Sequence, residues 1–197
     1  MKVSTRKSMI IFLAALMPVF LLGCASYHMG SVGRSIPGGY KQISVPVFKN
    51  KSMETGIEVA FSNSLIQEFQ RSKIVKIVDK NLSEVLIEGK IDSVEYQPES
   101  RKASGEASAP FLPNGTVIAT QYRILVHATV RIIRQADGME LWTGAFVGER
   151  TYAAPQVTLA GVNSVNPLYN LSARRQNIDV MASDMMAEAH DRMTENF

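Results

Sequence analysis

The sequence is poor in the residues that build reactive sites in enzymes and metal proteins. Its 197 residues include one cysteine, and its three histidines stand far apart at positions 28, 127 and 190. None of them has a second His or Cys at the spacing of a metal site. Gly-x-Ser-x-Gly, Gly-x-Gly-x-x-Gly, P-loop and His-Glu-x-x-His motifs are absent as well. The sequence therefore predicts neither catalysis nor a metal or other cofactor.

The sequence also lacks an apolar run long enough to cross a bilayer comfortably. Its longest run, Met9–Leu22, follows a basic start made by Lys2, Arg6 and Lys7. A basic start before a short apolar stretch is typical of a secretory signal peptide. We expect residues 1–23 to be removed on export.

The lone cysteine, Cys24, comes directly after that run, in the sequence Leu21-Leu22-Gly23-Cys24. This resembles the lipobox of bacterial lipoproteins, whose cysteine becomes the lipidated first residue. Exported proteins usually pair their cysteines, and a lipid thioether leaves no free thiol. Each buried acyl CH₂ contributes about 0.8 kcal/mol, so several chains give a lasting anchor. Ala25 in place of Asp favours the outer membrane, by the rule of enteric lipoproteins; the alternative is an ordinary signal peptide with a chance cysteine.

An excess of one charge is missing once the signal peptide is set aside. The chain has 21 basic and 18 acidic residues, but three of the basic ones and no acid lie within residues 1–23. The remainder is therefore balanced, which argues against binding nucleic acid or another polyanion over a broad surface. Only local basic patches, such as Arg101-Lys102, remain as anion-binding candidates.

What is present suits one domain with a sizeable core. Residues 24–42 are small, polar and glycine-rich, as in a tether, and we expect a single α/β domain over 43–197. Alternation predicts strands over 43–47, 73–78 and 85–96, the last with a bulge near Ser93. Apolar residues at helical spacing predict two amphipathic helices, over 54–71 (Ile57, Phe61, Leu65, Phe69) and from Pro167 (Leu171, Ile178, Met181, Met185, Ala189). Core packing explains the methionines better than a metal or ligand site.

The strongest strand signal is a pair of alternating runs on either side of Asp137-Gly138, which predicts a hairpin. A two-residue turn pairs Ala136 with Met139 and sets the register. One face is then wholly apolar and is expected to face the core: Ile124, Val126, Val130 and Ile132 beside Leu141, Ala145 and Val147. The opposite face is expected to be exposed: Arg123, His127, Arg131 and Ile133 beside Trp142 and Phe146.

This exposed face is the best candidate for a partner-binding surface, through Trp142, Phe146, Arg123 and Arg131. Trp, Phe and Arg dominate the buried contacts of interfaces. The alternative is a solvated face on which an Arg stacks over the indole, a contact of about 1 kcal/mol. On the first interpretation, truncating both aromatic side chains weakens partner binding and leaves the domain folded.

The order of elements predicts the fold class α+β, a two-layer sandwich with two amphipathic helices on one face of a four- to five-stranded mixed sheet. The other sheet face has no cover from this chain. Segments 97–118 and 151–166 have no apolar period and are expected to be irregular, and a loop of such length is usually functional or disordered.

Taken together, these pieces resemble a known family. Tyr27-His28, "ISVPVFKN", "ETGIEVAFSNSLIQEF", "EVLIEGKI", "YRILVHATVRII" and "ELWTGAF" resemble the lipopolysaccharide-assembly lipoprotein LptE over almost the whole mature chain. The resemblance implies a non-catalytic outer-membrane lipoprotein that plugs the lumen of the β-barrel LptD. Together the two proteins insert lipopolysaccharide into the outer leaflet.

The resemblance also gives the irregular segments a role. They would reach the barrel or the lipid, and some family members touch lipopolysaccharide through bases near these loops. Here Arg101 and Lys102 are the candidates, while "PFLPNGT" and "APQVTLAG" have no base. Two alternatives stay open: a CsgG-like periplasmic lipoprotein that activates a peptidoglycan synthase, because "ISVPVFKN" before a helix resembles that opening, and an envelope hydrolase.

Overall fold

The computed structural model describes residues 33–103, 114, 115, 117–153 and 167–195. The chain divides into two units, Met1–Gly33 and Arg34–Phe197, and the architecture below is that of the second. Its elements are β1 (Gln42–Ser44), β2 (Lys49–Asn50), α2 (Ile57–Ser72), β3 (Lys76–Ile77), the 3-10 turn η2 (Lys80–Leu82), β4 (Val85–Ala103), β5 (Val117–Arg134), β6 (Glu140–Ala153) and α3 (Pro167–Thr194).

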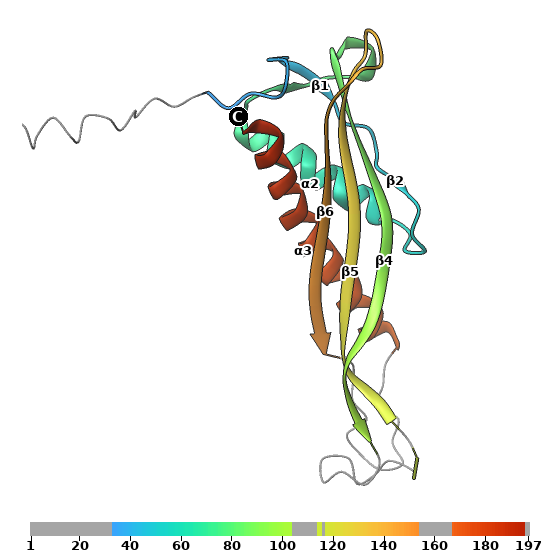
Figure 1. The fold of residues 1–197 in the computed structure, drawn as a ribbon. Helices are drawn as coiled ribbons and strands as arrows, with labels where there is room; N and C mark the ends of the chain where they lie inside the picture. Colours follow the sequence, from blue (N-terminus) through green and yellow to red (C-terminus); the bar gives the residue numbers. More distant parts are fainter. Residues whose placement is uncertain (1–32, 104–113, 116, 154–166, 196–197) are drawn as a thin grey trace, which may run out of the picture. The chain divides into compact units, whose positions relative to one another are not determined.

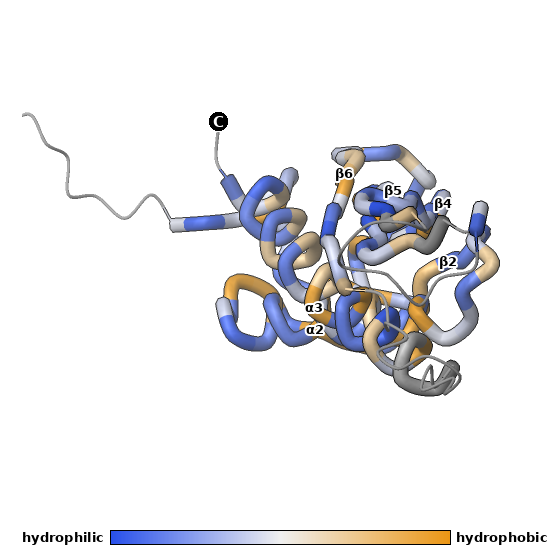
Figure 2. Tube along the Cα trace, turned by 90° about the horizontal axis from the view of Figure 1, so that it is seen from below, coloured by the Kyte–Doolittle hydropathy of each residue, from blue (hydrophilic) through white to orange (hydrophobic). Residues whose placement is uncertain are grey.

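The predicted fold class is confirmed: two helices pack on one side of an open mixed sheet (Figure 1). The sheet has six strands rather than four or five, in the order β3-β1-β4-β5-β6, with β2 paired to β4. The three long strands are antiparallel, whereas β1 pairs in parallel with β3 and β4. Seen along the strands, α2 and α3 lie together on one side of β4, β5 and β6 (Figure 2).

The core forms between the helices and one face of β4 and β5. Ile124, Val126, Val130 and Ile132 of β5 are all fully buried, as their alternation predicts. The register of β4 against β5 shifts between Ile91 and Ser93, so the bulge predicted near Ser93 is confirmed. This extra residue turns Val94 and Tyr96 onto the core face, opposite Val126 and Ile124.

Helix α2 has the predicted apolar stripe, with Ile57, Phe61, Leu65 and Phe69 all buried. It ends at Lys73, whose φ of 55° is left-handed and whose N–H closes the last turn on the Phe69 carbonyl. In α3, Ile178, Met181, Met185 and Ala189 are buried, so the methionines do pack in the core. Leu171 is 37% exposed, and its predicted place in that stripe is wrong.

The chain between β1 and β2 leaves the sheet and inserts Phe48 into the core. The Phe48 N–H donates to the Ser62 hydroxyl (2.8 Å), which donates to the Glu58 carbonyl. The Phe48 ring lies on Gly89 of β4, where an added Cβ would be 2.1 Å from a ring carbon. Pro46 therefore stands in a break of the strand predicted over 43–47.

Two predicted boundaries need correction. Residues 34–42, expected in the tether, belong to the folded unit: Ile36 is 1% exposed and β1 begins at Gln42. Segment 97–118 is irregular only in part, because β4 continues to Ala103 and pairs there with Val117. Likewise β6 continues to Ala153, opposite Gln121. Long pairing with β5 overrides the weak local signal of these ends.

Candidate partner-binding surface

The hairpin between β5 and β6 does not have the predicted two-residue turn. Ile133 pairs with Glu140 and Ile132 with Trp142, so Leu141 is an extra residue on β6. A strand has a side-chain period of two, and a slip of one residue exchanges its two faces. All of β6 beyond this bulge is therefore turned over relative to the prediction.

Trp142 and Phe146 consequently lie on the core side of the sheet, and their predicted exposure is wrong. Phe146 is 3% exposed, pairs with Ala128 and lies beneath Arg192 of α3, 5.1 Å from the guanidinium carbon. Trp142 is half-buried, with its ring 6.3 Å from that of Phe146. Conversely Val147, expected in the core, is 58% exposed.

The face opposite the helices, here called the outer face, holds two charge clusters. At the end near the β5–β6 turn, Arg131 contacts Glu88 (3.1 Å) and Glu140 (3.7 Å), and Lys49 reaches Glu88 at 3.7 Å. An open cavity of about 220 Å³ lies there, lined by Lys49, Glu88, Gly89, Lys90, Thr129 and Arg131. Beside it Asp92 accepts from Thr129 (2.7 Å) and from Lys90, and the Lys90 bond lowers the pKa of the Asp92 carboxyl.

The second cluster centres on Arg123, nearer the start of β5. Its guanidinium bonds Glu99 of β4 and Glu149 of β6, the latter at 3.1 Å. The Thr151 hydroxyl also donates to Glu99 (2.9 Å). The Arg123 hydrogen bond lowers the pKa of the Glu99 carboxyl and raises that of Arg123 itself. Arg123 and Arg131 thus lie on the outer face as predicted, each joined to acids on both neighbouring strands.

Between the clusters the outer face carries small side chains on β6, while Glu95 of β4 is an exposed acid opposite Leu125. Ala145 and Val147 of β6 are exposed there, opposite Thr129 and His127 of β5. Ala145, Val147 and Thr129 are small or β-branched, and the two charge clusters lie on either side of them. The outer face therefore has a charge cluster toward each end and short side chains on β6 between them.

The remaining candidates stand apart from this surface. Arg101 is exposed near the end of β4, where the ladder has register shifts, and its strand neighbour Lys102 pairs in the ladder with Ile118. The side chain of Lys102 lies outside the described residues, as does all of Cys24. Among the described side chains, Arg101 makes no ion pair with a residue of either charge cluster.

A polar cluster on the helix side has no counterpart in the sequence prediction. The Tyr96 hydroxyl donates to Glu54 (2.7 Å), and Arg174 of α3 lies over the Tyr96 ring and contacts Glu54 at 3.4 Å. Burial raises the pKa of Tyr96, and the hydrogen bond to Glu54 adds to it. This cluster ties α3 to β4 and to the start of α2. No periodic pattern connects three residues so far apart, so the sequence held no signal for it.

The described part of the chain offers neither a metal-binding cluster nor a membrane-spanning helix. It contains no group of three or more His, Cys, Asp or Glu side chains that could hold a metal ion. None of the helices in the same residues is both long and apolar enough to span a membrane.

Comparison with known families decides the relationship. The family model described as "LptE: Lipopolysaccharide-assembly" matches residues 40–195. The chain belongs to the LptE family. That match begins just before β1 and runs to the end of α3, so it covers the whole sandwich. No curated protein sequence matches the chain significantly.

Solved structures similar to this chain have low sequence identity to it. A Helicobacter pylori protein described as a neuraminyllactose-binding hemagglutinin homolog has a TM-score of 0.52 and 9% identity, over 85% of this LptE-family chain and 90% of its own. The rare lipoprotein B from Shewanella oneidensis has a TM-score of 0.40 and 16% identity, over 78% and 90%. A minor lipoprotein from Acinetobacter baumannii has 0.44 and 14%, over 79% and 91%. The first likeness shows the fold alone.

Proposed function

We propose that this LptE-family protein is a non-catalytic outer-membrane lipoprotein anchored through Cys24. It acts as plug and assembly partner of an LptD-type β-barrel in the transport of lipopolysaccharide to the outer leaflet. Family membership over residues 40–195 is the observation that carries this proposal. The lipobox-like sequence before Cys24 supports the anchor and the location.

The outer face supports the partnership. Both helices cover the other side of the sheet, so this face is free within the described residues to meet a second protein. Its paired charges and the exposed Glu95 suit contact with a polar surface, and the interior of a large barrel is polar. Arg123 and Arg131 are the proposed contacts on the plug. Arg101 and Lys102 are proposed to meet lipopolysaccharide near the tip of β4.

Depletion of the protein in its native host tests the function as a whole. We expect less lipopolysaccharide at the cell surface and less mature barrel protein. Pull-down after mild crosslinking should recover a large outer-membrane barrel. Recovery of a peptidoglycan synthase instead, with surface lipopolysaccharide unchanged, would replace this proposal by the CsgG-like alternative.

The double charge reversal Arg123→Glu, Arg131→Glu tests the outer face. We expect crosslinked barrel to fall at least several-fold, because both proposed contacts are lost and the two new carboxylates join four acidic neighbours in a surface of opposite charge. The pairs are exposed and add little to stability, but like charges directly opposite one another destabilise a sheet, so we expect a folded circular dichroism spectrum with a lower unfolding temperature. Arg192→Glu, on α3, is the matched reversal away from this face and should leave barrel recovery unchanged. Equal recovery from the double variant and the parent would remove Arg123 and Arg131 from the interface.

A further inference from the structure

The C-terminal ends of the two helices meet around a buried histidine that the function above does not use. His190 of α3 is 3% exposed. Its ring lies edge-on to Phe69 of α2, with the centroids 4.9 Å apart and the planes at 70°. Its carbonyl accepts from the Thr194 hydroxyl (2.9 Å), which holds the last turn of α3 in place.

Both ring nitrogens of His190 have a hydrogen-bond partner. Nε2 lies 2.9 Å from the Ser72 hydroxyl at the end of α2, and Nδ1 lies 3.4 Å from Oδ1 of Asp191. The Ser72 oxygen is also 3.2 Å from the Phe69 carbonyl, to which it can donate. The Ser72 hydroxyl can therefore make two alternative hydrogen bonds. It donates to Nε2 when the ring is neutral, and it donates to the Phe69 carbonyl while accepting from Nε2 when the ring is protonated. Rotation of one hydroxyl lets the site hold either form.

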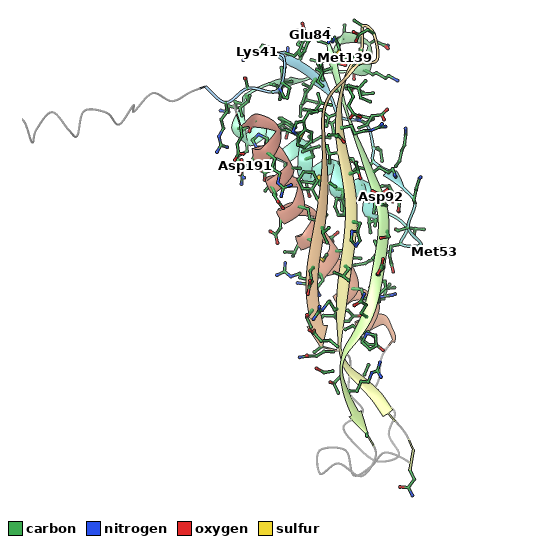
Figure 3. The ribbon with its side chains drawn as sticks, viewed as in Figure 1. Lys41, Met53, Glu84, Asp92, Met139 and Asp191 are labelled. Carbon is green, nitrogen blue, oxygen red and sulfur yellow. The ribbon has the colours of Figure 1, made fainter. Side chains whose placement is uncertain are left out.

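Asp191 links this site to the beginning of the folded unit. The same Oδ1 that faces Nδ1 accepts from Arg34 Nη1 at 2.8 Å. Two residues on, Ile36 is buried in the core, and the Gly39 N–H closes a turn on its carbonyl at 2.9 Å. Residues 34–40 are here called the N-terminal strap. Figure 3 labels Asp191 near the C-terminal end of α3, the end at which the strap is attached.

We propose that His190 and Asp191 form a proton-sensitive latch that fastens the N-terminal strap and the end of α3 to α2. With His190 neutral, Asp191 serves Arg34 as its counter-ion. With His190 protonated, one carboxylate oxygen is shared between two cations, and a charge lies buried against Phe69. Both changes weaken the interactions that attach the N-terminal strap and the last turn of α3 to the rest of the domain.

The charges around His190 fix the direction of the effect. Asp191 and Glu68 favour its protonated form, whereas Arg34 opposes it. Burial is the largest influence and lowers the pKa of His190 below its ordinary value. The unfolded chain therefore takes up this proton at a higher pH than the folded chain. The contribution of neutral His190 to the free energy of unfolding is fully present above about pH 6.5. It falls as the pH drops below 6.5, until His190 of the folded chain is protonated too.

The consequence extends to the segment that precedes the strap. If Cys24 carries the anchor proposed above, an open latch lengthens the tether by the strap, about 3.3 Å per residue. The latch itself needs neither the anchor nor the barrel, so its test is independent of both.

Hydrogen exchange and urea unfolding of the full chain in detergent, from pH 7.5 to 5, test the latch. We expect faster exchange in residues 34–40 and 186–195 at the acid end, relative to β5. We also expect the folding equilibrium constant to fall by up to about tenfold per pH unit below 6.5. His190→Asn should remove most of this pH dependence, and Asp191→Asn should extend the fall to lower pH, because the buried cation loses its counter-ion.

His127→Asn is the matched control, since His127 lies half-buried on the outer face of β5. It should keep the parent's pH profile. Should His190→Asn fail to fold, the pH dependence of hydrogen exchange in the Asp191→Asn protein still tests the latch. A parent whose stability and strap exchange are flat from pH 7.5 to 5 contradicts the latch. So does a pH dependence that His190→Asn leaves intact or His127→Asn removes.

Discussion

Phe146→Ala is expected to lower the free energy of unfolding by about 3 kcal/mol, the low end for a buried Phe at a sheet edge. The ring is 3% exposed beneath Arg192 and beside Trp142, so its removal leaves a cavity between β6 and α3. The neighbouring substitution Val147→Ala is the matched control. Val147 is 58% exposed on the outer face, and its truncation should change stability by less than about 0.5 kcal/mol.

Urea unfolding followed by far-ultraviolet circular dichroism measures both variants. The single tryptophan, Trp142, gives a second signal for the parent and for Val147→Ala. The two substitutions differ by one position along the strand, so they distinguish the observed register from the predicted one directly. If Val147→Ala were the damaging change and Phe146→Ala the mild one, the bulge at Leu141 would be refuted. Binding experiments with Phe146→Ala should be interpreted as tests of folding, not of the partner surface.

The helices and the central strands could be predicted because their signals are local. The stripe Ile57, Phe61, Leu65 and Phe69 has one interpretation at helical spacing, and all four are buried. The alternation of β5 likewise identifies its own core face. One strand's pattern says nothing, however, about how the next strand is offset from it.

The faces of β6 show why that offset is hard to predict. "LWTGAFVG" has apolar residues on both faces, so either assignment leaves one of them in the core. The length of the turn decides between the two assignments, and the Asp137-Gly138 sequence favoured a two-residue turn. In the structure the Arg134 N–H bonds the Met139 carbonyl and the Gly138 N–H bonds that of Arg134, which makes a longer turn. One extra residue at Leu141 then exchanged the faces of the rest of the strand, residues 142–153.

Of the candidate site, Arg123 and Arg131 were placed correctly because they belong to β5, whose face was right. Their carboxylate partners come from β4 and β6, and only the three-strand register brings them within reach. The strap was missed for a different reason. Glycines around Ile36 suggested a tether, but Gly38 has a φ of 86° and an added Cβ there would be 2.4 Å from the Tyr40 ring. Those glycines make a tight turn and not a flexible segment.

Gly89→Val is expected to lower the free energy of unfolding by about 3–4 kcal/mol. An added Cβ at Gly89 lies within 2.1–2.3 Å of three Phe48 ring atoms. That ring is 3% exposed and packs 6.2 Å from the Phe61 ring, so displacing it would disturb the core. Overpacking of a core costs about 1–3 kcal/mol, and expelling Phe48 would add its lost burial.

A double-mutant cycle identifies the cause. Phe48→Ala alone should cost about 3 kcal/mol, but in its presence Gly89→Ala should be neutral or slightly stabilising, since a Cβ favours the extended strand. In the parent the same Gly89→Ala change should destabilise by at least about 1 kcal/mol, so the two positions are coupled. Ala145→Val, which adds volume to an exposed strand position, should change stability by less than about 0.5 kcal/mol. Additive costs for Phe48→Ala and Gly89→Ala would show that the ring does not occupy the space above Gly89. The break between β1 and β2 would then need another reason, because placing Phe48 over Gly89 is what draws residues 45–48 out of the sheet.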